Sequence, residues 1–341
     1  MSKIIRFGLD LAKHSFSVCG VDAREQLVLR KTLSRDDLLV FFAQQAPAVI
    51  AMESGSGAHH WARCLTDQGH DARIIDPRFV APYRSQGKTG KNDANDAVAI
   101  CEAAGRPQMR FVPVKSAEQQ AQILIHRLRS TLVTEHTRTI NQLRGMLAEF
   151  GIVTAQGADH FKRNWPTLRQ QYDESLPPLA WETLDELFVE LTRVHQRILR
   201  CDRQIKAFVR EHLAARRLSE VPGIGAITAA ALVATVGDGR DFRNGRQFAA
   251  WLGLVPRQYS TGGKPRLGRI TKRGDRYLRT LLVHGARSEM TRTGKRGDHK
   301  SQWTEQLKAS KGWNKKAVAL ANKHARIAWS MLAHESRYQP A

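Results

Sequence analysis

Apolar residues in the first part of the chain occur in short runs that polar turns separate. The runs at 4–11, 16–21 and 27–33 have the length and the β-branched and aromatic content of strands. They predict three strands joined by short turns. Two further runs, at 48–52 and 72–75, predict two more strands.

Helical patterns lie between and after these strands. Ser34 precedes an apolar pattern over 38–45 and is expected to cap a helix there. Patterns at 59–68 and 92–104 predict two more helices. Three strands followed by helix, strand, helix, strand and helix is the order of a RuvC-like (ribonuclease H-like) α/β domain, which we place at 1–112.

The middle of the chain is predicted to be a helical hairpin, at 113–215. Helical spacing runs over 116–150 with a one-residue slip, and a region with three prolines at 151–178 is expected to interrupt the helix. A second helix has an apolar stripe whose spacings alternate between three and four, which is typical of a coiled-coil seam. One amphipathic helix packed on a core would give the same stripe. Its members are Leu184, Leu187, Leu191, Val194, Ile198, Cys201, Ile205 and Phe208.

The last part, 216–341, is predicted to be a mainly α-helical domain that ends in a helix over 313–332. Near its start, Gly223 and Gly225 form a Gly-x-Gly turn between two helical patterns. A helix-hairpin-helix of this kind presents free backbone N–H groups to a phosphate. Such turns also join ordinary helices, so the pattern alone leaves both interpretations open.

The charge of the chain favours a polyanionic partner. It has 54 Lys and Arg against 32 Asp and Glu, a net charge of +22, and an excess of this size suits DNA or RNA because bound phosphates release counterions. A merely basic soluble protein is the alternative. No apolar run approaches the ~20 residues of a membrane span, and no signal peptide is visible. No P-loop motif is present, which argues against an ATPase. The absence of paired cysteines suits a reducing cytoplasm and argues against disulfides or structural zinc; the cysteines are Cys19, Cys64, Cys101 and Cys201.

The segment 260–300 is the most basic part of the chain, with twelve Lys or Arg against three acids. Glycines follow Tyr259 and Ser260, which suggests backbone that must approach another group closely. A solvated basic loop is the alternative. If the segment binds nucleic acid, its cations would contact backbone phosphates rather than bases. These cations are Lys264, Arg266, Arg269, Lys272 and Arg273.

Four acids form the candidate catalytic site. Asp10 interrupts an apolar strand, where an unpaired charge would be costly, and Glu53 ends another strand. Asp93 and Asp96 are spaced i and i+3 on one helix face. Carboxylates are the ligands that Mg²⁺ (or Mn²⁺) prefers, and two such ions ~4 Å apart can catalyse phosphodiester cleavage. Singly, each acid could instead be a hydrogen-bonded or helix-capping residue.

Several stretches make the pattern more specific. FGLDLAK, AMESGSG and KTGKNDANDA carry the four acids. VPGIGAITAAALVATVGD and FAAWLGLVPRQYSTGGKPRLGRITKRGDRYLRTLLVHGA follow in the last part. These motifs resemble those of the DEDD transposases, the insertion-sequence recombinases of the IS110 family, and most of all its IS1111 subgroup. The resemblance covers nearly the whole chain, with generic helices in the middle.

The resemblance implies a RuvC-like domain, a coiled coil and a C-terminal transposase domain with a serine. Family members recombine DNA through that serine, guided by a structured (bridge) RNA that the element encodes. By motif matching, Asp10, Glu53, Asp93 and Asp96 take the DEDD positions. Ser260 takes the position of the nucleophile. In this chain Thr261 follows the serine, so a second hydroxyl is adjacent; the primary hydroxyl of Ser260 is preferred because it is less crowded.

The hypothesis is a two-part site that cuts and rejoins DNA through a 5′-phosphoserine intermediate. Sharing of sites between protomers would require a homodimer or a homotetramer, acting on the nucleoid in the bacterial cytoplasm. The alternative is a metal-dependent RuvC-like nuclease, such as a junction resolvase, that uses water as the nucleophile. A non-enzymatic architectural protein is a third interpretation, and it predicts that loss of Asp10 would change no activity.

Overall fold

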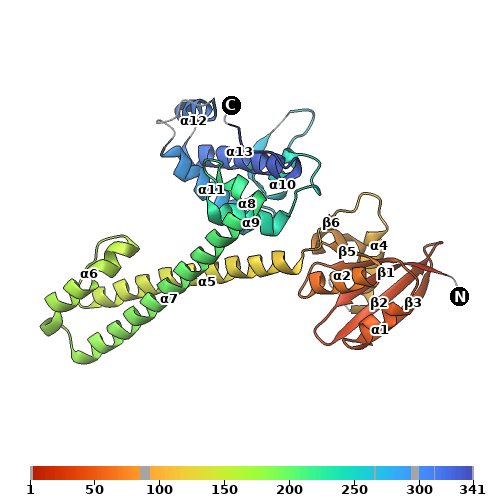
Figure 1. Ribbon diagram of the computed structural model, residues 1–341, viewed down its shortest axis with the longest axis horizontal. Helices are drawn as coiled ribbons and strands as arrows, with labels where there is room; N and C mark the ends of the chain where they lie inside the picture. Colours follow the sequence, from red (N-terminus) through yellow and green to blue (C-terminus); the bar gives the residue numbers. More distant parts are fainter. Residues whose placement is uncertain (1–2, 85–92, 265, 293–298, 311, 340–341) are drawn as a thin grey trace. The chain divides into compact units, whose positions relative to one another are not determined.

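The computed structural model describes residues 3–84, 93–264, 266–292, 299–310 and 312–339. The chain divides into two compact units, Met1–Ala117 and Glu118–Ala341 (Figure 1). The first holds a mixed sheet, and the second is mainly helical. The sequence-based boundary near residue 215, inside the second unit, stays a prediction.

The first unit is built on a six-stranded mixed sheet, in the order β3-β2-β1-β4-β5-β6. The first three strands pair antiparallel, β4 and β5 run parallel to β1, and β6 closes the edge antiparallel to β5. The five predicted strands are confirmed, and β6 was missed because two residues show no period. The strands are β1 (Ile4–Leu11), β2 (Ser15–Asp22), β3 (Leu27–Ser34), β4 (Val49–Glu53), β5 (Asp71–Ile75) and β6 (Phe111–Val112).

The two faces of the sheet carry different helices because strand side chains alternate in direction. Phe7, Leu9 and Met52 lie in a core with residues of α1 and α2. On the opposite face, Ala51 packs with Ile100 of α4. The helices of this unit are α1 (Asp37–Ala43), α2 (Ala58–Asp67), α3 (Pro77–Val80), η1 (Ala81–Tyr83) and α4 (Asp93–Ala104).

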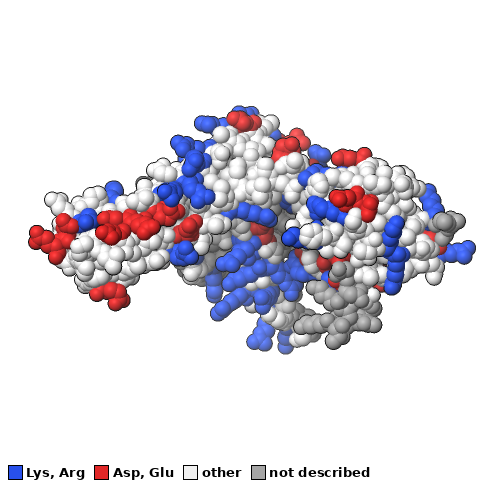
Figure 2. Space-filling model, turned by 90° about the horizontal axis from the view of Figure 1, so that it is seen from below, with Lys and Arg blue, Asp and Glu red and all other residues white. Residues whose placement is uncertain are grey.

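Two long helices begin the second unit. They are α5 (Ala117–Glu149) and α7 (Pro178–Glu211), and Figure 1 shows them side by side. Leu132 of α5 packs with Val194 and Ile198 of α7, and Arg129 Nε lies 2.5 Å from Asp202 Oδ1. These two helices therefore pack against each other, and the coiled-coil seam and the bounds 113–215 stay predictions. Figure 2 shows acidic side chains gathered along its outer part, with a dense group of Lys and Arg elsewhere on the same face.

The segment between these helices interrupts them as expected, because α5 ends at Glu149 and α7 begins at Pro178. The sequence patterns did not predict that the segment has a helix of its own, α6 (Ala158–Gln171), with Pro166 inside it, and the short η2 (Asp173–Ser175). Phe161 and Trp165 are buried one turn apart, and Trp165 stacks on Phe188 of α7 with ring centroids 4.5 Å apart. Burial of two aromatic side chains offsets the backbone hydrogen bond that proline cannot make.

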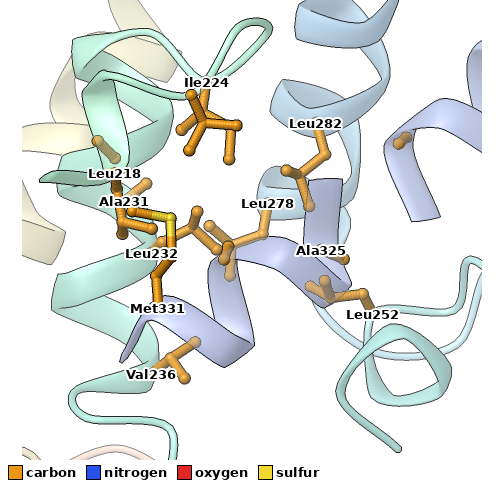
Figure 3. Packing of buried hydrophobic residues seen from close by; sticks show 14 of the residues in the cluster. Leu218, Ile224, Ala231, Leu232, Val236, Leu252, Leu278, Leu282, Ala325 and Met331 are labelled. Carbon is orange, nitrogen blue, oxygen red and sulfur yellow. The ribbon is translucent and has the colours of Figure 1, made fainter. Parts of the chain in front are cut away.

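The rest of the unit surrounds α9, a helix that is apolar on all sides and therefore buried. Figure 3 shows Ile224 and Leu232 beside Leu278 of α11, with Met331 of α13 closing the cluster. None of the described helices is both long and apolar enough to cross a membrane. The remaining elements are α8 (Leu213–Ser219), α9 (Ala226–Val236), α10 (Gly245–Trp251), β7 (Pro256–Gln258), β8 (Leu267–Ile270), α11 (Arg276–Met290), α12 (His299–Ser310) and α13 (Trp313–Ala333).

Candidate active site

The register of two strands brings the first two acids together. β1 and β4 are parallel, and Leu9 pairs with Met52 at the last matched position. One residue further along, Asp10 and Glu53 lie at the same level on adjacent strands. Since Leu9 and Met52 point into the core beneath α1 and α2, the two acids point to the opposite face, which α4 covers.

Gly8 allows α4 to lie directly on β1. A Cβ atom at this position would lie 2.1 Å from the carbonyl oxygen of Ala97 and 2.7 Å from Cβ of Cys101. Only a residue without a side chain therefore permits this approach. Asp96, which directly precedes Ala97, is 5% exposed and is held beside the ends of the two strands.

One arginine joins the acids. Arg84, which follows η1, donates from Nε to Asp96 Oδ1 at 2.6 Å and from Nη2 to Glu53 Oε1 at 3.1 Å. The hydrogen bond to Asp96, with the charges of Asp96, Glu53 and Asp10, raises the pKa of Arg84 against the opposing effect of burial. Among the described residues, Arg84 therefore bonds to Glu53 of β4 and Asp96 of α4, and the charge of Asp10 of β1 also acts on it. Sequence patterns missed Arg84 because it lies in a loop.

The fourth predicted acid, Asp93, is the first residue of α4. It lies one turn before Asp96 on the same helix face, but its side chain is outside the described part of the chain. Among the described residues, no group of three or more His, Cys, Asp or Glu is arranged to hold a metal ion. The donor chemistry fits a divalent cation, because Glu53 and Asp96 already hold the positive charge of Arg84 between them and Mg²⁺ prefers oxygen ligands. The four-acid metal site stays a prediction.

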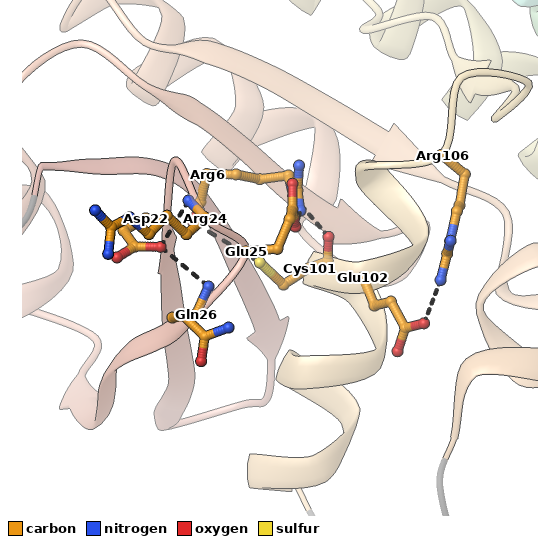
Figure 4. A network of polar contacts seen from close by, with 8 residues as sticks. All are labelled: Arg6, Asp22, Arg24, Glu25, Gln26, Cys101, Glu102 and Arg106. Atoms are coloured by element: carbon orange, nitrogen blue, oxygen red, sulfur yellow. Dashed lines mark hydrogen bonds and ion pairs between the residues drawn. The ribbon is translucent and has the colours of Figure 1, made fainter.

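A second polar contact holds the other end of α4. Figure 4 shows Arg6 of β1 reaching Cys101 and Glu25. Arg6 Nε donates to the Cys101 carbonyl oxygen at 2.8 Å, and Nη2 pairs with Glu25. Gly105 makes room for the guanidinium, since a Cβ there would lie 2.6 Å from it. The sequence patterns missed Arg6, and an arginine inside an apolar strand is the signal that could have indicated this contact.

Ser260 lies two residues after β7 in the hairpin that β7 and β8 form, just before the turn at its tip. Its Oγ accepts a hydrogen bond from Gln258 Nε2 at 2.8 Å and a longer one from the backbone N–H of Arg266 at 3.4 Å. The side chains of Ser260 and Thr261 are exposed. The serine is therefore accessible to a large substrate and its oxygen is oriented by two donors.

The two glycines after Thr261 are explained by the turn. Gly262 and Gly263 have φ of 56° and 74°, the positive values that a tight hairpin turn of the I′ type requires at both central positions. A Cβ at either would meet no described atom within 4 Å. The backbone at these glycines therefore approaches no described part of the chain closely, and close approach to another molecule stays a prediction.

The base of this hairpin is fixed by direct backbone contact. A Cβ at Gly253 would lie 2.1 Å from the Arg273 carbonyl oxygen, and one at Gly274 would lie 1.8 Å from that of Trp251. The backbone of Lys272 also donates to the Gly253 carbonyl oxygen at 3.1 Å. The cations predicted to bind phosphates are all exposed on this hairpin and its base: Lys264, Arg266, Arg269, Lys272 and Arg273.

A helix, a turn and a helix (α8, the turn and α9) follow one another around Gly223 and Gly225, and the helix-hairpin-helix itself stays a prediction. Gly223 has φ of +87°, and a Cβ there would lie 2.3 Å from Cε1 of His324 and 2.7 Å from Oε2 of Glu289, two buried residues whose side chains lie 2.6 Å apart. Gly225 is exposed and directly precedes α9. Packing thus explains Gly223, and phosphate binding by the turn stays a prediction.

Comparison of the sequence with known proteins identifies the family of this chain. A family model of IS110 DEDD proteins, described as a transposase, matches residues 7–152, and one described as the transposase IS116/IS110/IS902 family matches 215–302. A probable family 20 transposase of Pseudomonas aeruginosa is 51% identical over 336 residues, which cover 98% of each chain. This chain belongs to the IS110-family DEDD transposases.

Other relatives of this transposase are named for insertion sequences. The transposase of element IS1111A from Coxiella burnetii is 37% identical, over 99% of this chain and 92% of the relative's length. The transposase of element IS1328 from Yersinia enterocolitica is 40% identical, over 96% of this chain and 97% of the relative's length. The family resemblance inferred from the motifs is confirmed, and the protein is a DNA transposase.

Proposed function

We propose that this transposase cuts and rejoins DNA with a Mg²⁺-binding acidic site and a serine nucleophile. The observation that supports the proposal is the pair of hydrogen bonds from Arg84 to Glu53 and Asp96, with the charge of Asp10 also acting on this arginine. Asp93 is added because it precedes Asp96 by one helical turn. Bound Mg²⁺ or Mn²⁺ would polarise the scissile phosphate and stabilise charge on the leaving oxygen.

Ser260 is the proposed nucleophile. Its Oγ bonds to phosphorus while the bond from phosphorus to the 3′ oxygen breaks, which leaves a 5′-phosphoserine and a 3′ oxygen that takes up a proton. The proton from Oγ passes to a carboxylate, for which Asp93 or Asp96 is the candidate. The two hydrogen bonds to Oγ support this role, because both use oxygen as the acceptor and neither uses the hydroxyl hydrogen. The phosphoserine conserves the bond for rejoining without ATP.

The partners follow from charge and from the family. The exposed cations on and below the serine hairpin would contact backbone phosphates of DNA. A structured guide RNA encoded by the element is proposed on family resemblance. Strand exchange requires several sites, so a homodimer or a homotetramer is proposed, acting on the nucleoid in the bacterial cytoplasm.

The test is a search for the covalent intermediate. The protein is incubated with element-end DNA, Mg²⁺ and the element-encoded RNA, and a denaturing gel then separates free DNA from a protein–DNA adduct. Wild type and Thr261→Ala should form the adduct, whereas Ser260→Ala should not. Asp10→Asn should abolish cleavage; full activity of that variant would contradict the metal site.

Two other outcomes would redirect the assignment. An adduct that persists in Ser260→Ala and disappears in Thr261→Ala would move the nucleophile by one residue. Cleavage that proceeds without an adduct, and that Ser260→Ala does not slow, would identify water as the nucleophile and the protein as a metal-dependent nuclease.

A further inference from the structure

Arg84 lies where the proposed metal would need to bind. Its guanidinium contacts Oδ1 of Asp96 and Oε1 of Glu53, and these contacts are largely shielded from water. The side chain of Arg84 is 24% exposed, that of Glu53 is 20% exposed and that of Asp96 is 7% exposed. Charge pairs in such surroundings are screened less than surface pairs.

The arginine and a metal ion exclude each other at these oxygens. A Mg²⁺ ion lies about 2.0–2.1 Å from each of its ligand oxygens. The guanidinium nitrogens of Arg84 occupy the space beside these two oxygens that the ion would need. Two cations at such a short separation also repel strongly in a partly dry site. A divalent ion that takes Asp96 Oδ1 and Glu53 Oε1 therefore displaces Arg84 from both.

We propose that Arg84 is an internal counter-ion that competes with the divalent metal for Glu53 and Asp96 and releases both carboxylates when the metal binds. This inference rests on the proposed metal site. Without metal, Arg84 offsets the repulsion among the acids and keeps them in place. It is a positioning residue, and its presence lowers the apparent affinity for the metal.

The size of the effect follows from the fraction of molecules in which Arg84 is docked. An apparent dissociation constant equals the intrinsic one divided by the fraction that is competent to bind, so a docked fraction of about nine in ten, which we assume, weakens metal binding about tenfold. Arg84→Gln should therefore bind the metal about tenfold more tightly than wild type. Arg84→Lys, which keeps the charge but loses the two-pronged contact, should lie between the two.

The experiment uses the full-length protein without DNA and Mn²⁺ as the probe. Free Mn²⁺ is measured by electron paramagnetic resonance during a titration, and thermal unfolding is followed with and without Mn²⁺. Arg84→Gln should bind Mn²⁺ more tightly and unfold at a lower temperature than wild type when no metal is present. The difference in unfolding temperature should shrink at saturating Mn²⁺.

Arg78 supplies the matched control. It forms a two-pronged pair with Asp76, at 2.9 and 2.7 Å, in the same unit. Arg78→Gln removes the same charge but should leave Mn²⁺ affinity within about twofold of wild type, because this residue does not contact the acids of the site. Equal tightening in both variants would mean general charge rather than competition and would overturn the proposal.

Two further outcomes are decisive. If Arg84→Gln binds Mn²⁺ as weakly as wild type, or more weakly, then Arg84 does not compete with the metal, and the proposal is overturned. The proposed metal site would not be contradicted by that result. Asp10→Asn combined with Glu53→Gln should lose the Mn²⁺ site. If that double variant binds Mn²⁺ as wild type does, the proposed metal site is itself wrong, and the role of Arg84 falls with it.

Discussion

The contact between Gly8 and α4 provides the sharpest test of how the acids are positioned. In Gly8→Ala the new Cβ would lie 2.1 Å from the Ala97 carbonyl oxygen and 2.7 Å from the Cys101 backbone nitrogen. Both atoms belong to the backbone of a regular helix, so no side-chain rotation relieves the clash. The helix itself must move away from β1.

The required displacement can be estimated from the contact. Ordinary van der Waals contacts of a Cβ begin at 3.4 Å, so α4 must move by about 1.3 Å. Overpacking of a core costs roughly 1–3 kcal/mol of folding free energy. Catalytic geometry is less tolerant, since groups must be held within about 0.5 Å of their working positions. Gly8→Ala should therefore remain folded at moderate cost while losing most of its DNA cleavage, because Asp96 moves with the helix.

The assay pairs urea unfolding with the cleavage reaction. Gly20→Ala is the control, because the nearest atoms that a Cβ there meets belong to side chains, Ile4 at 3.0 Å and Phe7 at 3.3 Å, rather than to a helix backbone. The control should lose little of either property. The reasoning would be refuted if Gly8→Ala cleaved DNA at the wild-type rate, or if both variants lost stability and activity to the same degree.

Two further predictions concern the second unit. Gly223→Ala should lower the unfolding free energy of this unit by about 2 kcal/mol or more, because φ is +87° and the new Cβ meets His324. Gly225→Ala should change it by less than about 0.5 kcal/mol, because a Cβ there meets open space. Equal effects of the two substitutions in urea unfolding would contradict this prediction. Burial, aided by a nearby arginine, lowers the pKa of His126 to about 4. The unfolded chain then binds more protons than the folded one between about pH 6.5 and 4, so stability should fall by up to about 3 kcal/mol as the pH drops through that window. His126→Asn should flatten this dependence in unfolding measured against pH, and an unchanged slope would argue against it.

Sequence patterns predicted the parts of the fold that show a clear period. The strands β1 to β5 and the helix with Asp96 were predicted because their apolar residues form clear runs. The structure shows that two of these strands, β1 and β4, pair in parallel. The helix α6 was missed because Pro166 is a strong local signal against a helix, while the burial of Trp165 is decided by distant residues. The hairpin of β7 and β8 was missed because its strands are short and exposed.

The candidate site shows the same division between local and distant causes. Asp10 and Glu53 could be placed from the sequence, because each stands out against an apolar strand. The importance of Arg84 could not, since an arginine in a polar loop looks like any other surface cation until the fold brings Glu53 and Asp96 to it. A sequence pattern can identify a residue that differs from its neighbours in the chain, such as Asp10. A residue like Arg84, which resembles its neighbours in the chain, is identified only by its contacts in the tertiary structure.

Helix α4 connects packing to chemistry in this transposase. Its C-terminal half is held by Arg6, which donates to the Cys101 carbonyl oxygen, and its middle lies against Gly8. Asp96 lies on the same rigid element, and a helix transmits displacement along its axis because its backbone hydrogen bonds resist bending. Gly8 sets the distance of the helix from the strand, and Asp10, two residues further along β1, lies on the same face of the sheet as the helix. A change at Gly8 therefore alters the position of Asp96 relative to this face.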